Sequence, residues 1–177
     1  MRVTGDSAAM RFNAQLLAAS LSEIPAAAWS LASAYPDTGV HHGYRRVVLV
    51  SAGRRQRYAE LFDDVWRVLH PVRDAWLSRI EPGGFIVPHR DPAPWFERWQ
   101  VPIATAGQWH YGADDSAADP GVAFPVRHWE PHAVTNRTAA ARVHIVVDRD
   151  IRIDRDPLPF HIFPPAGMAD MIERTTQ

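Results

Sequence analysis

The chain has 177 residues, of which 46% are hydrophobic, and its 19 lysines and arginines nearly balance its 20 aspartates and glutamates. This length fits one domain with a sizeable core, and the composition argues against a disordered chain and against a generally basic nucleic-acid-binding protein. Cysteine is absent, which excludes a disulfide scaffold and a thiolate metal site. Any bound metal must therefore be held by nitrogen and oxygen atoms.

The sequence shows no pattern of a signal peptide or a membrane span. Its strongest apolar run near a basic flank is only Val47 to Val50, far shorter than either pattern requires. We therefore expect a soluble, cytoplasmic protein that does not bind membranes. The segment "SAGRRQR" is a small basic patch, which supports binding or oxidation of nucleic acid only weakly.

The first seventy residues are predicted to be helical with one strand. Residues 11–33 are expected to be helical, with a second short helix beginning at Pro25, because four apolar residues fall on one face: Leu16, Leu17, Leu21 and Ile24. The segment "HHGYRRVVLVSAG" predicts a strand that enters a turn. Residues 56–69 give the clearest helical pattern, through apolar residues at three- and four-residue spacing: Leu61, Phe62, Val65, Trp66 and Leu69.

The second part of the chain is predicted to be mainly β. Short apolar runs such as "AWLSRIEPGG", "FIVPHRD" and "RWQVPIATAG" are separated by Gly, Pro and Asp turns, and residues 112–121 are expected to form a loop. Strands in succession favour a sandwich or jelly roll over alternating βαβ units. We expect a single domain over residues 1–177, with a supporting part (1–70), a β core (71–155) and a C-terminal tail (156–177).

The stretch "GFIVPHRDPAPW" carries the first chemical signal. Residues i and i+2 of a strand point to the same side, so His89 and Asp91 at its end converge on one point. A third ligand is offered by His132, which precedes a distant strand. Two histidines and one carboxylate form the facial triad of non-haem Fe(II) oxygenases, which leaves coordination positions open for a bidentate co-substrate and dioxygen.

A second signal lies on the strand "AARVHIVV". Val143, Ile145 and Val147 form one face of this strand, so Arg142 and His144 share the other. An arginine aimed into a strand-built cavity is costly unless it meets a carboxylate, which it binds bidentately. The distal carboxylate of 2-oxoglutarate meets that need.

Each of these residues also has an ordinary structural interpretation. Asp91 could orient a surface His89, His132 could cap a turn, and Arg142 could face solvent. Their joint order and spacing favour the metal site. The other histidines are expected to be structural or exposed: His41, His42, His70, His110, His128, His144 and His161.

Together, the motifs "LSRIEPGGFIVPHRD", "RWQVPIATAG", "PHAVTN" and "ARVHIVVD" resemble those of the aspartyl/asparaginyl β-hydroxylase family of Fe(II)/2-oxoglutarate-dependent dioxygenases. The resemblance covers roughly residues 75–150. It implies a double-stranded β-helix, a jelly roll of the cupin type, with the metal near one mouth of the barrel. The N-terminal helices would then support the outer face of the barrel.

The resemblance also implies roles for individual residues. His89 and His132 would be iron ligands, and Arg142 would form a salt bridge with 2-oxoglutarate, with the hydroxyl of Ser78 beside it. Arg98 would face the active site and bind the carboxylate of the substrate.

Two positions bear on how closely the chain follows the family. The position two after Arg98 is commonly His in the family and here is Gln100, which would contact either co-substrate or substrate. Some members lack the carboxylate ligand, whereas this chain has Asp91. An intact carboxylate favours hydroxylation over halogenation, because a halide would need that coordination position.

The reaction implied is hydroxylation of an unactivated C–H with Fe(II), 2-oxoglutarate and O2. The expected substrate carries a carboxylate and is a free amino acid, an Asp or Asn residue of a peptide, or a natural-product precursor. Arg45 or Arg46 could assist Arg98, although a solvated strand start is the preferred interpretation of this pair.

Two other functions stay open at this point: a cupin-type metalloenzyme that does not use 2-oxoglutarate, and a non-catalytic jelly-roll binding module whose histidines are incidental. Four tryptophans near the motifs are expected to pack the barrel rather than wall the site: Trp95, Trp99, Trp109 and Trp129.

Overall fold

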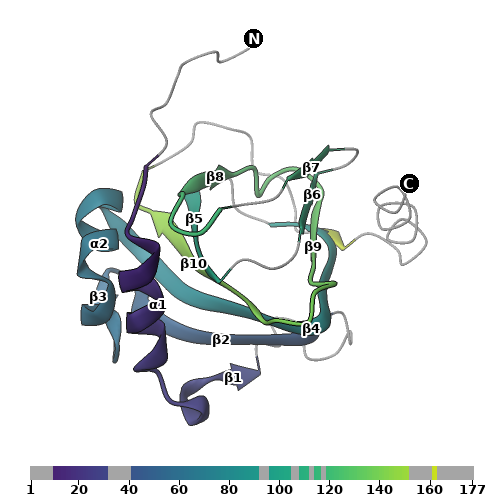
Figure 1. The fold of residues 1–177 in the computed structure, drawn as a ribbon. Helices are drawn as coiled ribbons and strands as arrows, with labels where there is room; N and C mark the ends of the chain where they lie inside the picture. Colours follow the sequence, from purple (N-terminus) through teal and green to yellow (C-terminus); the bar gives the residue numbers. More distant parts are fainter. Residues whose placement is uncertain are drawn as a thin grey trace.

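The structure is a computed structural model, which describes residues 10–31, 41–91, 96–104, 108–111, 114–116, 119–151 and 161–162. In these ranges, antiparallel strands form one strongly bent sheet, and short helices cover its outer side (Figure 1). The helices are α1 (Ala14–Ser22), η1 (Ala26–Ala28), η2 (Ala59–Phe62) and α2 (Asp63–Leu69). The strands are β1 (Ser30–Leu31), β2 (His41–Ser51), β3 (Arg54–Arg55), β4 (Val72–Arg90), β5 (Glu97–Ala104), β6 (Gln108–Tyr111), β7 (Asp114–Ser116), β8 (Phe124–Val126), β9 (His132–Thr135), β10 (Arg142–Arg149) and β11 (His161–Ile162).

Strand β4 is the centre of the sheet, whose main path runs β7-β6-β9-β4-β10-β5-β8. Its first half pairs with β2 and β10, and its second half pairs with the start of β2 and with β9 and β11. Figure 1 shows β4 curving from the side of the barrel that carries β10 to the side that carries β9. The predicted mainly β jelly roll is confirmed, but the two strands expected between residues 75 and 91 are one continuous strand.

The bend in β4 depends on two glycines and a buried asparagine. Gly83 has a φ of +72°, and a Cβ on Gly84 would lie 2.7 Å from the carbonyl oxygen of His42, so both positions favour glycine. The side chain of Asn136 donates to the Ile80 carbonyl at 2.9 Å, and its backbone exchanges hydrogen bonds with Gly83 and Gly84. These bonds satisfy the backbone where the strand turns, so the chain bends there without leaving the sheet.

The N-terminal helix is shorter than predicted. Helix α1 begins after Asn13, whose side chain caps it, and the predicted helix at Pro25 is only the three residues of η1. Residues 30–31 pair with β2 as a strand, so the prediction of a helix over 11–33 was wrong in its last part. Leu17 is buried as expected, whereas Leu16 is 60% exposed.

Three other sequence predictions need adjustment. The helix expected over 56–69 begins only at η2, because Tyr58 adopts a left-handed φ of +71°. The expected loop over 112–121 contains β7, which pairs with β6. In the C-terminal tail, residues 161–162 fold back and pair with the end of β4. The single domain and its division into three parts stay predictions.

The main core lies between the outer face of the sheet and the helices. The predicted face of β10 is confirmed, since Val143, Ile145 and Val147 are buried there against side chains of α1, η2 and α2. Trp99 packs in this core, as expected for a barrel-packing residue, whereas Trp95 and the side chain of Trp109 lie outside the described residues. The alternating residues of β10 and β5 therefore face the interior of the barrel.

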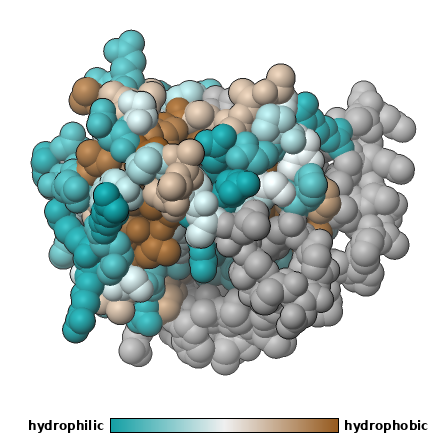
Figure 2. All heavy atoms as spheres, turned by 90° about the horizontal axis from the view of Figure 1, so that it is seen from below, coloured by the Kyte–Doolittle hydropathy of each residue, from teal (hydrophilic) through white to brown (hydrophobic). Residues whose placement is uncertain are grey.

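The surface of the described part is largely polar. Its exposed large hydrophobic residues are Leu16, Val48, Val68 and Ile151. Figure 2 shows hydrophilic side chains around a smaller apolar area on the face seen from below. Among the described helices, none has the length and apolar character needed to cross a membrane.

Candidate metal centre and binding cavity

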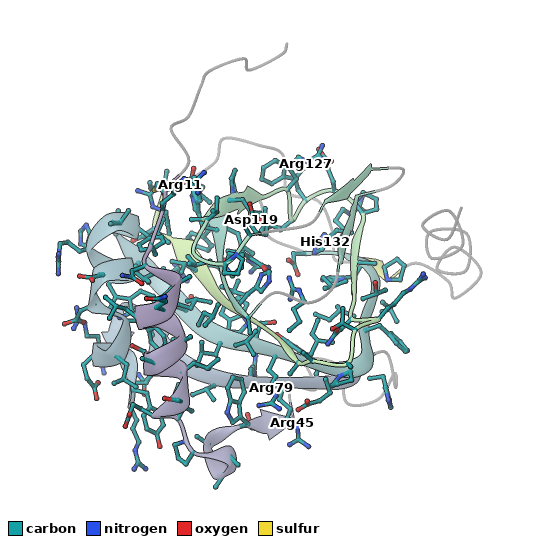
Figure 3. The ribbon with its side chains drawn as sticks, viewed as in Figure 1. Arg11, Arg45, Arg79, Asp119, Arg127 and His132 are labelled. Atoms are coloured by element: carbon teal, nitrogen blue, oxygen red, sulfur yellow. The ribbon has the colours of Figure 1, made fainter. Side chains whose placement is uncertain are left out.

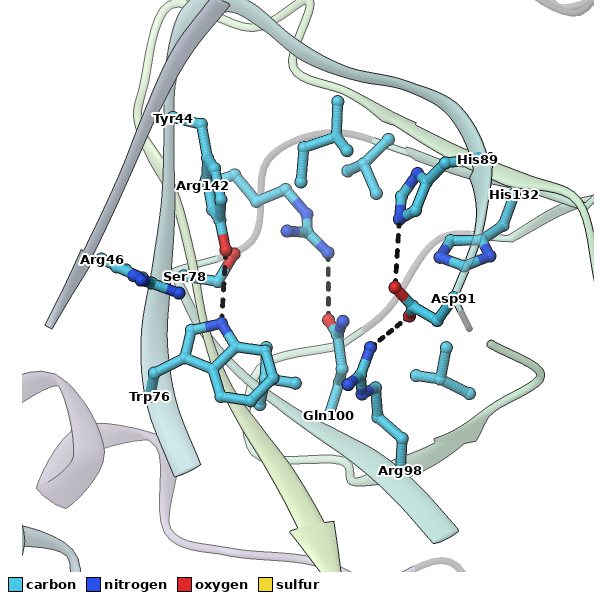
Figure 4. Close-up of a pocket in the computed structure, with 14 residues that line it drawn as sticks. Tyr44, Arg46, Trp76, Ser78, His89, Asp91, Arg98, Gln100, His132 and Arg142 are labelled. Carbon is cyan, nitrogen blue, oxygen red and sulfur yellow. Dashed lines mark hydrogen bonds and ion pairs between the residues drawn. The ribbon is translucent and has the colours of Figure 1, made fainter. Parts of the chain in front are cut away.

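The interior of the barrel contains a cavity of about 150 Å³ (Figure 4). All seven site residues predicted from the sequence line it: Ser78, His89, Asp91, Arg98, Gln100, His132 and Arg142. The other lining residues are Tyr44, Arg46, Trp76, Ile86, Val126, Val134 and Val146. Residues far apart in the sequence thus meet in one cavity.

One wall of the cavity carries the predicted triad. His89 lies at the end of β4, Asp91 follows it, and His132 begins β9 directly opposite His89 in the strand register. One nitrogen or oxygen ligand atom of each residue lies within 4.8 Å of the others, and His89 Nε2 is 3.8 Å from Asp91 Oδ1. Ligand atoms on one face of an octahedral ion with bonds of about 2.1 Å lie about 3 Å apart, so side-chain shifts of roughly 1–2 Å bring the three atoms to one ion.

Both histidines are held in the form that binds metals. His89 Nδ1 lies 2.8 Å from the Val87 carbonyl oxygen, and His132 Nδ1 lies 2.9 Å from that of Glu130. A carbonyl only accepts, so Nδ1 carries the proton in the neutral form of each ring, and Nε2 then has a lone pair for a metal. Burial, together with repulsion from His89, lowers the pKa of His132 to about 3, which keeps this ring neutral. These residues fit a divalent ion such as Fe(II).

Arg98 fixes the carboxylate of the triad. Its Nε and Nη2 donate to Asp148 at 2.6 and 2.9 Å, and its Nη1 donates to Asp91 Oδ2. Burial raises the pKa of Asp91, but attraction to the Arg98 guanidinium outweighs it and leaves the pKa below its ordinary value. Asp91 is therefore an anion with Oδ1 turned toward His89. The predicted contact of Arg98 with a substrate stays a prediction; in the structure this guanidinium holds two carboxylates of the protein.

The opposite wall carries Arg142, which is only 1% exposed. Its Nη2 donates to Gln100 Oε1 at 3.2 Å, and the same oxygen lies 2.7 Å from His144 Nδ1. Burial, and then the cation of Arg142, lowers the pKa of His144 well below its ordinary value. His144 is therefore neutral, and its Nδ1 also lies 3.0 Å from Arg142 Nη2, so Arg142, Gln100 and His144 form one buried polar cluster. Figure 4 shows Arg142 reaching into the cavity across from the triad.

The burial of His144 predicts a pH-dependent stability of the metal-free protein. Its pKa is about 6.5 in the unfolded chain and far lower in the folded one, so below pH 6.5 only the unfolded chain takes up the proton. Between pH 6.5 and 5.5 this uptake lowers the free energy of unfolding by about 1 kcal/mol. Urea unfolding with a chelator present, in wild type and His144→Leu, measures this loss. The variant should lose about 1 kcal/mol less over this range; an equal loss in both proteins would contradict it.

Other cavity residues were not predicted, or only in part. Tyr44 and Trp76 face inward, and the Trp76 indole donates to the Tyr44 hydroxyl at 3.2 Å. Arg46 lines the cavity too, whereas the adjacent Arg45 pairs with Glu81 at 3.6 Å. Alternation on β2 could have separated the two arginines, but which of them faces inward depends on the pairing of β2 with β4.

The remaining histidines divide as follows. His42 and His70 are exposed and His128 and His144 are buried, whereas the side chains of His41, His110 and His161 lie outside the described residues. The backbone of His128 accepts a hydrogen bond from the Asp91 N–H at 3.0 Å. This bond helps to position Asp91 beyond the end of β4.

Comparison with known proteins identifies the fold. No known family model matches the chain, and no curated protein sequence matches it. Among solved structures, it is similar to a cupin-2 domain protein of Rhodospirillum rubrum (TM-score 0.52, 14% identity, 82% of each chain covered). It is also similar to a cupin 2 conserved barrel domain protein of Rhodopseudomonas palustris (0.51, 10%, 82% of this chain and 81% of that chain).

A third similar structure is the polyketide cyclase RemF of Streptomyces resistomycificus (TM-score 0.50, 14% identity, 77% of this chain and 85% of that chain). The likeness to all three shows a jelly roll of the cupin type. This chain is thus a cupin-type jelly-roll protein with a candidate metal site made of two histidines and one aspartate.

Proposed function

We propose that the protein is an Fe(II)/2-oxoglutarate-dependent dioxygenase that hydroxylates an unactivated C–H of a carboxylate-bearing substrate. The observation that carries the proposal is one cavity with a His-Asp-His cluster on one wall and the buried Arg142 on the other (Figure 4). Three protein ligands leave three positions of an octahedral ion open, enough for a bidentate co-substrate and dioxygen. When bound, Fe(II) and 2-oxoglutarate would supply the oxidising chemistry.

The residues of the chain bind, orient and exclude water. In this proposal, Arg142 binds the distal carboxylate of 2-oxoglutarate with two parallel hydrogen bonds, and Ser78 stands beside it on the inner face of β4. Arg98 keeps Asp91 ionised and oriented. The apolar side chains of Val126, Val134 and Val146 narrow the space between the two walls and limit the access of water.

The resemblance to the aspartyl/asparaginyl β-hydroxylase family supports the same function. Its spaced motifs fall at positions that the fold brings together, because His132 lies opposite His89 and Arg142 shares the interior with both. The intact Asp91 supports hydroxylation over halogenation. The proposed substrates remain a free amino acid, an Asp or Asn residue of a peptide, or a natural-product precursor.

A cupin-type metalloenzyme without 2-oxoglutarate is the second candidate. It is favoured by the cupin-2 proteins among the similar structures. Such an enzyme would use the triad but would not require Arg142 to bind a co-substrate. A requirement for 2-oxoglutarate separates the two candidates.

Turnover of 2-oxoglutarate without a substrate tests the proposal. Protein supplied with Fe(II), 2-oxoglutarate and air should form succinate slowly, as measured by proton NMR. Asp91→Ala should reduce the rate at least about tenfold. Loss of a group that only supports a metal ligand already lowers metal affinity or activity at least about tenfold, and Asp91 is itself a proposed ligand. Asp150→Ala is the control, because Asp150 is exposed. Succinate formation no faster than with free Fe(II), or equal in both variants, would contradict the proposal.

A further inference from the structure

Three arginines line the cavity, and they differ in what their side chains contact. Arg98 is held by Asp91 and Asp148, and the buried Arg142 contacts Gln100. The third arginine, Arg46, is exposed, and within the described part of the chain no hydrogen bond or ion pair involves its guanidinium. An available cation at a cavity edge is a ready binding group for an anion.

The sheet register fixes the direction of Arg46. It lies opposite Ser78, whereas the adjacent Arg45 lies opposite Arg79. Alternation then places Arg46 on the cavity side and Arg45 on the outer face, where Arg45 and Arg79 both contact Glu81. Figure 3 shows Arg45 and Arg79 close together near β1, and Figure 4 shows Arg46 beside Ser78 and Trp76.

Arg46 and Arg142 lie at different depths. Arg142 is almost fully buried, whereas Arg46 is exposed on β2, where the cavity meets solvent. Arg46, Trp76 and the triad line the same cavity, so a molecule whose carboxylate meets Arg46 can extend over Trp76 toward the triad. Besides the polar side chains of Tyr44, Ser78 and Gln100, the cavity is lined by four aliphatic residues: Ile86, Val126, Val134 and Val146.

We infer that Arg46, and not Arg98, binds the carboxylate of the substrate, and that the substrate is a small carboxylic acid with an apolar body. The cavity of about 150 Å³ fits a small molecule. The reaction of this substrate rests on the proposed function, whereas its binding to Arg46 does not. Arg98 then acts as a positioning residue for Asp91.

Binding of defined acids tests the inference. The probes are the twenty standard L-amino acids and the linear monocarboxylates from acetate to hexanoate, each paired with its primary amide. They are titrated calorimetrically, without oxygen, into protein with Fe(II) and 2-oxoglutarate and into metal-free protein. At least one acid should bind at least tenfold more tightly than its amide. Arg46→Gln should weaken this acid at least tenfold, and the control Arg45→Gln less than twofold.

Several results would overturn the inference: no acid binds, Arg46→Gln leaves the affinity unchanged, or Arg45→Gln weakens the acid equally. The inference would also be overturned if Arg46→Gln lost as much affinity for 2-oxoglutarate as Arg142→Met does, because the co-substrate would then bind at Arg46.

A separate titration with 2-oxoglutarate distinguishes this inference from the proposed function. If 2-oxoglutarate does not bind but an acid binds through Arg46, the proposed function fails and this inference stands. If 2-oxoglutarate binds but no acid binds through Arg46, this inference fails and the proposed function stands.

Discussion

Replacement of His132 with alanine is expected to weaken Fe(II) binding more than 100-fold. His132 supplies one of three ligand atoms, and its Nε2 is held ready by the bond from Nδ1 to the Glu130 carbonyl. Loss of an outer group that supports a ligand already lowers metal affinity by roughly 10- to 100-fold, so loss of the ligand itself should exceed that range. Anaerobic equilibrium dialysis with Fe(II) gives the affinity directly.

The matched control for this change is His70→Ala, since His70 is exposed and lies outside the cavity. It should bind one iron per chain with the affinity of the wild type. Far-UV circular dichroism verifies that both variants are folded. Wild-type iron affinity in a folded His132→Ala protein would exclude this histidine from the metal centre.

Replacement of Arg142 with methionine is expected to lower the affinity for 2-oxoglutarate by about 30-fold or more while iron binding is retained. Removing one partner of a buried, hydrogen-bonded charge pair costs about 2–5 kcal/mol, and each 1.4 kcal/mol is a tenfold change. Methionine removes the contacts of Arg142 Nη2 with Gln100 Oε1 at 3.2 Å and His144 Nδ1 at 3.0 Å, and it leaves Gln100 and His144 in contact with each other at 2.7 Å. Arg142→Lys keeps the charge but cannot form the bidentate hydrogen bonds, so its affinity for 2-oxoglutarate should fall between those of the wild type and Arg142→Met.

Calorimetric titration of 2-oxoglutarate into the Fe(II)-loaded variants, without oxygen, measures this effect. Arg67→Met is the control, because Arg67 is an exposed arginine that pairs with Asp64 across one helical turn and lies outside the cavity. Retained iron binding shows that Arg142→Met still folds around the metal site. If its affinity for 2-oxoglutarate is unchanged, the metalloenzyme that does not use this co-substrate becomes the better account.

Local sequence patterns were sufficient for much of the candidate site. Spacing of two residues on a strand placed His89 and Asp91 on one side, and the apolar alternation of β10 placed Arg142 in the interior. Both are properties of a single strand, so they can be read without the partner strands. The resemblance to a known family supplied Ser78, Arg98 and Gln100.

Features that depend on the register between strands were not predicted. Arg98 contacts Asp148 because β5 pairs with β10 at these two residues, fifty positions apart. The inward direction of Arg46 depends in the same way on the pairing of β2 with β4.

The continuous, bent strand β4 was not predicted either, for a different reason. A Pro-Gly-Gly sequence usually marks a turn between two strands. Here β4 continues through this sequence, because Asn136, more than fifty residues further along the chain, satisfies the backbone at the bend. Local sequence contains no sign of this contact.

An anaerobic titration with Fe(II) and then 2-oxoglutarate tests the central claim most directly, through the weak visible charge-transfer band of the iron–2-oxoglutarate chelate. It requires no knowledge of the substrate. The account predicts a band that saturates at one iron and one 2-oxoglutarate per chain and weakens in Asp91→Ala and in Arg142→Met. A folded wild-type protein that gives no band would contradict the account.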